Sequence, residues 1–150
     1  MSRDIFPYTC PMQPKIDQLK HHFAGCTSPY DKIIELGRDL PPLPKADQIP
    51  ANLVSGCQST LYLKTTFREG KLYFETQADA LISAGLAVLL TSVLSGETPE
   101  TVLTFEPTYL TELNIPASLS PSRANGLASL HLRMKQEALK MLTANHSQAL

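Results

Sequence analysis

The sequence predicts an α+β domain, in which a small antiparallel sheet of about three strands packs against several helices. Two short runs of alternating polarity in the middle of the chain predict a β-hairpin, and helical periodicity dominates on both sides of it. The length of 150 residues fits one domain, since domains commonly hold about 100–200 residues. A hydrophobic share of 43% is enough for one buried core. We therefore expect a loose, proline-rich leader at residues 1–14 and a single domain over residues 15–145.

The first helix is expected over residues 15–24, where apolar side chains recur three and four positions apart. His21 and His22 are adjacent and therefore point to different sides of such a helix. We expect both to be solvated, because histidine pairs that bind metal on a helix are spaced by about three or four residues.

Ser28-Pro29 predicts the start of a second helix, with the serine as N-cap and the proline at the first helical position. Gly37 lies near the end of this helix. Residues 41–50 then hold four prolines in ten positions. Because proline fixes φ and lacks an N–H donor, this segment is expected to be an ordered surface connection, neither helix nor central strand.

The hairpin is expected from residues 59–67 and 71–76, where polar and apolar side chains alternate with a period of two. Glu69-Gly70 lies between the two runs, and a short connection containing glycine is typical of a tight hairpin turn. We expect one face of this hairpin to pack on the apolar helix that follows it.

The rest of the chain is predicted to be helical. Residues 78–95 are apolar on nearly all sides, so this helix should be the most buried one. Thr98-Pro99 starts a short helix, a further turn is expected at residues 108–114, and Ser120-Pro121 opens the last helix. The apolar stripe of the last helix consists of Leu127, Leu130, Met134, Ala138 and Met141. Its other face carries Arg133, Lys135, Gln136, Glu137 and Lys140.

Charge and composition exclude several classes of partner. The 13 basic and 14 acidic side chains give a net charge of −1, so no basic surface for nucleic acid or anionic membranes is expected. The longest apolar stretch, around residues 80–90, falls short of the about 18–20 apolar residues that a membrane span needs. The first residues resemble neither a signal peptide nor a transit peptide. Three cysteines without a CxxC motif indicate free thiols in a reducing compartment, and we expect the protein in the cytoplasm.

The most suggestive local motif is Gly56-Cys57-Gln58-Ser59, between the proline-rich connection and the first strand. A glycine beside a cysteine allows an unusual backbone path and the close approach of another molecule. Cys57 is therefore the candidate reactive thiol, against the alternative of a small buried side chain. Cys10 and Cys26 are expected to be incidental.

A second motif lies at the start of the last helix, around Arg123 and Gly126. A cation in the first turn of a helix opposes the helix dipole, so Arg123 needs a compensating partner. The candidates are a carbonyl, a carboxylate such as Glu112, or a thiolate or persulfide. Gly126 costs about 1 kcal/mol in a helix interior relative to alanine, and close packing of the helix on the sheet is its simplest explanation.

Four segments of the chain together resemble the SufE family, which includes the CsdE proteins. They are YDKIIELGRDLPPLP at 30–44, GCQS at 56–59, ADALISAGLAVLL at 78–90 and SLSPSRANGLASL at 118–130. The resemblance runs from about residue 15 to residue 143, with the segments in the same order and at similar separations, and four matches are more specific than one.

The resemblance implies a sulfur acceptor for iron–sulfur cluster assembly. Cys57 matches the residue of the family that takes persulfide sulfur from a PLP-dependent cysteine desulfurase of the SufS/CsdA type, stimulates that enzyme and passes the sulfur to a cluster scaffold or another acceptor. Gln58 and Arg123 match supporting positions. The family implies no resident cofactor, and it is compatible with a monomer or a homodimer.

The sequence also departs from the family pattern at two positions. Asp79, Gly85 and Leu86 match the central helix of the family, whereas Gln77 and Ala84 stand where members often carry an acidic and a basic residue. These two departures lie outside the sulfur loop, so they concern the docking of the desulfurase.

Three alternative functions follow from the residues. An iron–sulfur or zinc scaffold would need about three or four converging ligands, and no closely spaced ligand pair surrounds Cys57. A cysteine hydrolase would need a histidine beside Cys57, and His131 on the last helix is the candidate if it faces the hairpin. An adaptor that only binds the desulfurase would not need the Cys57 thiol.

Overall fold

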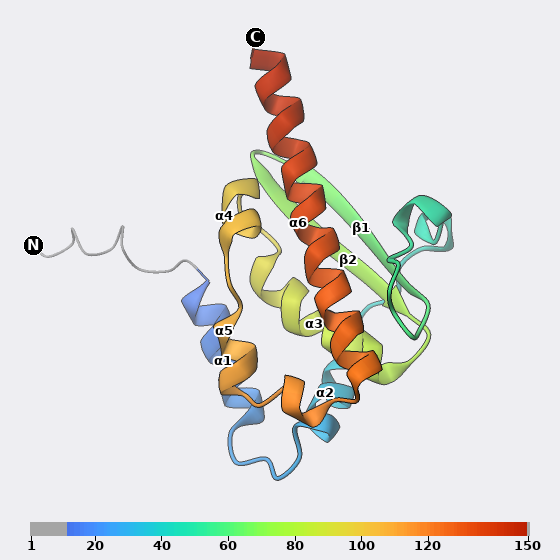
Figure 1. Cartoon of the computed structure of the whole chain (residues 1–150), viewed down its shortest axis with the longest axis vertical. Coiled ribbons are helices and arrows are strands. Elements are labelled where there is room, and N and C mark those ends of the chain that lie inside the picture. The colour runs from blue at the N-terminus through green and yellow to red at the C-terminus, as the bar shows by residue number, and fades with distance from the viewer. Residues whose placement is uncertain (1–11, 150) are drawn as a thin grey trace, which may run out of the picture.

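The computed structural model describes the backbone of residues 12–149 and the side chains of residues 12–144. It confirms the α+β class: the described part of the chain contains six α-helices and one two-stranded antiparallel sheet, which lies at one side of the molecule (Figure 1). Cys10 and most of the predicted leader lie outside the described residues. Helix α1 spans Gln13–Phe23 and so begins two residues earlier than the sequence predicts.

Helix α2 spans Pro29–Arg38, as the Ser28-Pro29 signal predicts, although the Ser28 side chain makes no capping hydrogen bond. The connection that follows contains two single 3₁₀ turns, η2 (Lys45–Asp47) and η3 (Pro50–Asn52). It is anchored by the buried Leu43, whose N–H donates to Gln77 Oε1 at 2.8 Å. Gln77, one of the departures from the family pattern, therefore holds the proline-rich connection on the sheet.

The hairpin consists of β1 (Leu61–Arg68) and β2 (Lys71–Ala78), which pair along their full length. Glu69 and Gly70 form the turn with φ values of 54° and 80°. Two successive positive φ angles are typical of the type I′ turn, whose twist matches that of the strands. The expected third strand is absent from the described residues, where single bridges at Leu53–Tyr62 and Leu72–Glu97 flank the pair.

Helix α3 spans Leu81–Leu94 and is the most buried helix, as predicted. It begins three residues later than the sequence predicts, because β2 continues to Ala78 and Asp79 still belongs to the base of the hairpin. There Thr60 N–H donates to Asp79 Oδ1 at 3.1 Å, and Asp79 N–H donates to the Thr60 carbonyl at 3.2 Å. Strand β2 packs on α3, which confirms the predicted contact between the hairpin and this helix.

Helices α2 and α3 approach each other at two glycines. A Cβ atom on Gly85 would overlap the carbonyl group of Ile33 in α2. A Cβ atom on Gly37 would overlap the Leu81 carbonyl oxygen and lie 2.9 Å from the Gly85 nitrogen. The backbones of the two helices therefore touch directly, and only glycine fits at these two positions.

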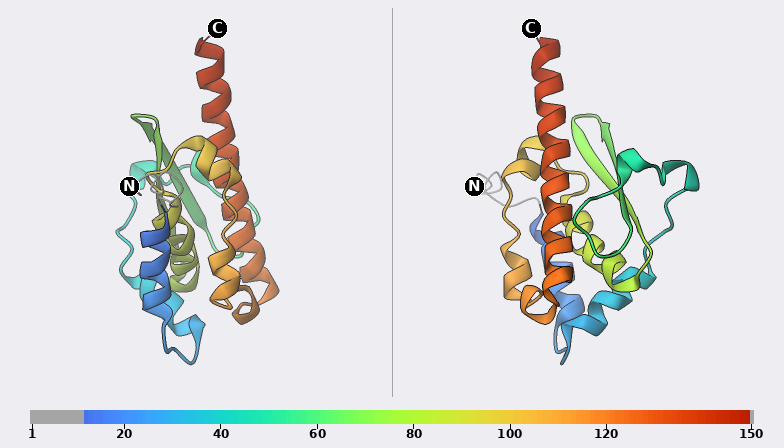
Figure 2. Two further views of the ribbon diagram at one scale, coloured as in Figure 1. Left: turned by 90° about the vertical axis from the view of Figure 1, so that its left-hand side faces the viewer. Right: turned by 45° about the vertical axis from the view of Figure 1, so that its right-hand side comes forward.

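The C-terminal part of the chain covers the other side of α3. Helices α4 (Pro99–Thr104) and α5 (Thr108–Glu112) are short, a 3₁₀ turn η4 (Pro116–Ser118) follows, and α6 (Pro121–Ala149) crosses the molecule. Tyr109 of α5 is buried, and its hydroxyl donates to the Leu89 carbonyl of α3 at 2.6 Å. The last part of α6 extends beyond the hairpin (Figure 2).

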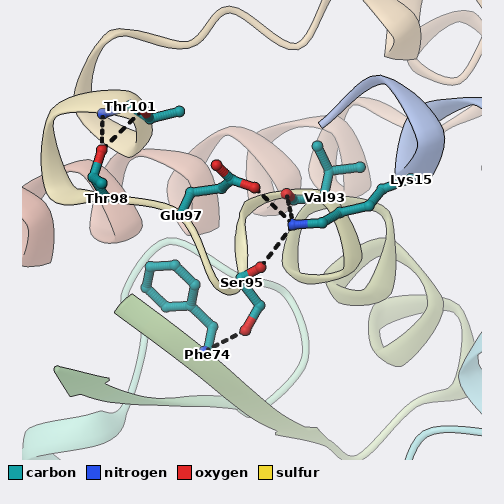
Figure 3. A network of polar contacts seen from close by, with 7 residues as sticks. All are labelled: Lys15, Phe74, Val93, Ser95, Glu97, Thr98 and Thr101. Carbon is teal, nitrogen blue, oxygen red and sulfur yellow. Dashed lines mark hydrogen bonds and ion pairs between the residues drawn. The ribbon is translucent and has the colours of Figure 1, made fainter. Parts of the chain in front are cut away.

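A polar cluster at the end of α3 ties α1 to the sheet (Figure 3). Lys15 Nζ donates to the carbonyls of Val93 and Ser95 at 3.2 and 2.9 Å and pairs with the buried Glu97 carboxylate at 2.8 Å. Ser95 Oγ accepts from Phe74 N–H of β2 at 3.0 Å. Lys15 therefore satisfies carbonyls that the helix end leaves without partners and compensates a buried charge. None of the helices described here combines the length and apolarity needed to cross a membrane.

The glycine contact gives a direct test of the packing. Gly85→Ala should destabilise the protein by at least about 2 kcal/mol, because the added methyl group must push two packed helices apart. Gly126→Ala is a matched control on α6, where the added Cβ would have nothing closer than 3.8 Å. That control should be neutral or up to about 1 kcal/mol more stable, because alanine favours helix. Urea unfolding measures the free energy of unfolding of both variants. Equal values for Gly85→Ala and Gly126→Ala would contradict the close approach of α2 and α3.

Candidate functional site

Cys57 lies on the loop between η3 and β1, where α6 passes beside it. Gly56 precedes it with φ of +89°, in the left-handed region that favours glycine. A Cβ atom on Gly56 would also overlap the hydroxyl of Ser129 on α6. Glycine is thus required here twice, once for the backbone turn and once for the approach to α6, and this turn places Cys57 against the helix.

The Cys57 side chain is half-buried against Gly126 of α6. Its Sγ donates to the Gly126 carbonyl oxygen at 3.7 Å, a long and weak hydrogen bond. The nearest atoms to a Cβ on Gly126 would be Cα and Sγ of Cys57, both at 3.8 Å. The neighbour of Gly126 is therefore the cysteine loop, whereas the sequence suggests packing on the sheet.

Arg123 projects from the first turn of α6 onto two serine hydroxyls. Its Nη1 donates to Ser59 Oγ at 2.7 Å and to Ser83 Oγ at 2.6 Å, and Ser83 Oγ donates to Ser59 Oγ at 2.8 Å. Glu112, the carboxylate considered from the sequence, pairs with Lys20. No carboxylate among the described residues forms an ion pair with Arg123, and its side-chain hydrogen bonds within this part of the chain go to neutral hydroxyls.

These residues meet at one pocket. Cys57, Gln58 and Arg123 line it together with Ser83, and its apolar wall is formed by Leu86 and Leu127. The structure therefore brings together all three residues that the sequence places at the site. A thiol, a cation and two hydroxyls beside an apolar wall can hold a small polarisable anion such as a sulfur species.

Burial controls the chemistry of the thiol in this conformation. It raises the pKa of Cys57 above that of an ordinary thiol, because the charged thiolate loses water that the surroundings do not replace. A thiolate or persulfide was one of the partners that the sequence suggested for Arg123. The raised pKa instead lowers the fraction of Cys57 that is ionised in this conformation.

The position of His131 contradicts the hydrolase interpretation. His131 lines a different pocket, together with Leu90 of α3 and Leu110 of α5, and does not face the hairpin. Its buried Nε2 atom has no hydrogen-bond partner among the residues that the structure describes. Of the adjacent pair, His21 is exposed, while His22 is half-buried with Nε2 3.0 Å from the Lys32 carbonyl oxygen. Among the side chains of residues 12–144, no three His, Cys, Asp or Glu residues are grouped to hold a metal ion.

Two contributors to the site escape sequence analysis. Ser83 lies in the apolar central helix, where a lone serine gives no signal. Arg133 lies on the polar face of α6, yet it contacts the loop that carries Cys57, as described below. A usable signal is the spacing of Ser122, Gly126, Ser129 and Arg133, which recur four, three and four positions apart and so form one helix face beside the apolar stripe.

Comparison with known proteins identifies relatives over most of the chain. The family model of SufE, described as an Fe-S metabolism associated domain, matches residues 14–138. An uncharacterized SufE-like protein from Synechocystis sp. is 30% identical over 131 residues, which cover 85% of this chain and 82% of the relative. The chloroplastic/mitochondrial SufE-like protein 1 of Arabidopsis thaliana is 31% identical over 134 residues, 87% of this chain but only 36% of that protein. The solution structure of a hypothetical protein from Thermus thermophilus superimposes with a TM-score of 0.70 at 25% identity, covering 87% of this chain and 97% of that one.

The raised pKa predicts how Cys57 reacts with iodoacetamide. Only the thiolate reacts, so the alkylation rate should rise with pH and then reach a plateau. Because burial raises the pKa, the midpoint of this rise should lie at a higher pH than for an unstructured cysteine peptide, when both are measured from about pH 6 to pH 11. At neutral pH, Cys57 should react more slowly than the peptide, and unfolding in urea should remove the difference. An inflection below that of the peptide would show that the site activates the thiol.

Proposed function

The chain belongs to the SufE family, and from this membership and the cysteine pocket we propose that Cys57 accepts persulfide sulfur from a PLP-dependent cysteine desulfurase and passes it on for iron–sulfur cluster assembly. The observation that carries the proposal is the position of Cys57, a half-buried thiol at the tip of a loop, in one pocket with Arg123. A thiol in this position is protected at rest and close enough to the surface to be presented to a partner.

The transfer is an exchange between a thiolate and a persulfide. The Cys57 thiolate attacks the outer sulfur of the persulfide on the desulfurase cysteine, and a new S–S bond forms on Cys57. The S–S bond on the desulfurase breaks, and its cysteine leaves as a thiolate. The outer sulfur keeps its proton, so one sulfur atom moves, one negative charge moves in the opposite direction, and no external oxidant or reductant is needed.

The pKa of Cys57 links this reaction to binding of the partner. In the closed loop the thiol is protonated, because desolvation disfavours its thiolate. Moving Cys57 out of the pocket restores contact with water and returns the pKa toward its ordinary value. Presentation to the desulfurase thus also increases the thiolate fraction, which favours reaction with the partner over reaction with stray thiols or oxidants.

The pocket then serves the product. Once the loop closes again, the outer sulfur of the Cys57 persulfide enters the space bounded by Leu86, Leu127 and Arg123. The outer sulfur can then release its proton to water, and the guanidinium favours the resulting anion, since no carboxylate partner among the described residues cancels the charge of Arg123. We propose that the sulfur is carried in this state to a cluster scaffold or another acceptor in a reducing compartment, the cytoplasm.

The proposal predicts where sulfur is carried. After incubation with a SufS-type desulfurase and cysteine, peptide mass spectrometry should show an added mass of about 32 Da, one sulfur atom, on the peptide that contains Cys57. Cys57→Ser should lose the modification and the stimulation of the desulfurase. A modification confined to Cys10 or Cys26 would disprove the assignment, and stimulation by Cys57→Ser would identify an adaptor that needs no thiol.

Arg123 provides a second test. Arg123→Met keeps the aliphatic stem and removes the cation, so the protein should stay folded while sulfur transfer to Cys57 becomes several-fold slower, about three- to tenfold for the loss of one charge-assisted contact. Arg38→Met is the matched control, because Arg38 is exposed at the end of α2, away from the pocket.

The two possible roles of Arg123 separate in these measurements. A lower melting temperature with an unchanged transfer rate for each folded molecule would make Arg123 a structural residue only. An unchanged rate in a folded variant of normal stability would remove Arg123 from the site.

A further inference from the structure

Arg133 is the most heavily engaged side chain on the polar face of α6. Its Nη1 donates to the Leu53 carbonyl at 2.9 Å, and its Nη2 donates to the Ala51 carbonyl at 2.6 Å. Its Nε donates to Glu137 Oε2 at 3.0 Å, one helical turn further along α6. The guanidinium is thus fixed by a carboxylate on its own helix and bridges to two carbonyls of a segment about 80 residues earlier in the chain.

The two carbonyls belong to the segment that leads into the Cys57 loop. Immediately after them, Val54 N–H donates to the Leu61 carbonyl at 2.9 Å, so this arm also touches the start of β1. The other arm of the loop is fixed by Asp79, whose carboxylate accepts from Thr60 N–H at 3.1 Å. The hydrogen bonds that hold the two arms are 2.6 to 3.1 Å long, which is no longer than the ordinary range for an N–H···O bond.

The tip between these arms is held differently. Residues 55–58, which form the tip, make two hydrogen bonds with α6: Cys57 Sγ donates to the Gly126 carbonyl at 3.7 Å, and the Ser129 hydroxyl donates to the Gly56 carbonyl at 3.5 Å. Ser59, the next residue, belongs to the C-terminal arm, where its hydroxyl accepts from Arg123 Nη1 at 2.7 Å. Both bonds of the tip are at the long limit for a hydrogen bond, and a thiol is a weak donor. Opening the tip therefore breaks weak contacts, whereas opening the arm that contains Ala51 and Leu53 breaks charge-assisted ones.

From this contrast we propose that Arg133 is a positioning residue, which holds the N-terminal arm of the Cys57 loop on α6 so that only the tip, residues 55–58, moves when Cys57 is presented. The expected effect on sulfur transfer rests on the proposed function. The hydrogen bonds from Arg133 to the arm, which we call the clamp, are present in the free protein. A fixed arm limits the positions that the exposed thiol can reach. The loop then presents Cys57 in a defined direction, and the ordering is already present before the partner binds.

The clamp makes two measurements move in opposite directions. In Arg133→Met the arm loosens, Cys57 becomes more exposed, and its alkylation by iodoacetamide at neutral pH should become about three- to tenfold faster, as the loss of one or two hydrogen bonds allows. The pH profile of alkylation should shift toward that of an ordinary thiol. Sulfur transfer from a SufS-type desulfurase should instead become less efficient, through a higher KM for this protein as acceptor with kcat nearly unchanged.

Controls separate the clamp from a general loss of structure. Lys135→Met is the matched control, because it removes a cation two positions away that pairs with the exposed Glu106 and contacts no part of the loop. Alkylation of Cys26, the other free thiol with a described side chain, serves as an internal reference for global opening. Arg133→Lys keeps the charge and the stem but has one nitrogen for two carbonyls, so its effects should be intermediate, and it replaces Arg133→Met if the latter does not fold.

The possible outcomes test the positioning role of Arg133 separately from the proposed function. A Cys57 to Cys26 alkylation ratio equal to that of the wild type in folded Arg133→Met and Arg133→Lys would overturn the positioning role. The ratio also stays unchanged when the alkylation rates of both cysteines rise by the same factor, and that pattern would indicate general destabilisation of the protein. If the wild type takes no sulfur onto Cys57, the proposed function fails, while the alkylation ratio still tests Arg133.

Discussion

The direct contact between α2 and α3 at Gly37 and Gly85 is the constraint on which the rest of the structure depends. Because no side chain lies between them, the contact of the two backbones fixes the position and orientation of α3 relative to α2. Helix α3 is apolar on almost all sides, so each remaining face has to be covered by another element. The hairpin covers one face and α6 another, and the Cys57 loop lies where these two layers meet. Shifting α3 would move Ser83, and with it the hydroxyl pair that receives Arg123.

This arrangement joins two requirements that oppose each other in a sulfur carrier. A reactive thiol needs solvent and a thiolate, whereas a stored persulfide needs shelter from other thiols. The loop meets both because its arms and its tip are held with different strength. Short hydrogen bonds fix the arms at Arg133 and Asp79, while the tip rests on contacts of 3.5 and 3.7 Å. In the conformation described, burial raises the pKa of Cys57. In the opening that we propose, the tip would expose the thiol while the arms stay in place.

The sequence was sufficient where local chemistry decides the structure. Glu69-Gly70 specifies a tight turn by backbone preference, Ser120-Pro121 a helix start, and the alternation on both sides of the turn a hairpin. It failed where partners distant in sequence decide. The start of α3 depends on Asp79 pairing with Thr60, and the direction of the Cys57 pKa shift depends on how much water the folded loop excludes. The expected third strand is replaced, in the described part of the chain, by single bridges from Leu53 and Glu97, which lie far apart in the sequence and contact different strands.

Arginines 123 and 133 show how the same residue type acquires different roles on one helix. Arg133 faces carbonyls and the Glu137 carboxylate, so its charge is compensated and its effect is to hold a backbone in place. Among the described residues, the side chain of Arg123 donates to the hydroxyls of Ser59 and Ser83, which orient its guanidinium without cancelling the charge. A carboxylate in their place would neutralise the pocket and remove any preference for an anion. The cationic pocket does not lower the pKa of the resting thiol, since desolvation dominates there. We infer that Arg123 acts at a later stage, on the anionic sulfur that Cys57 brings back when the loop closes.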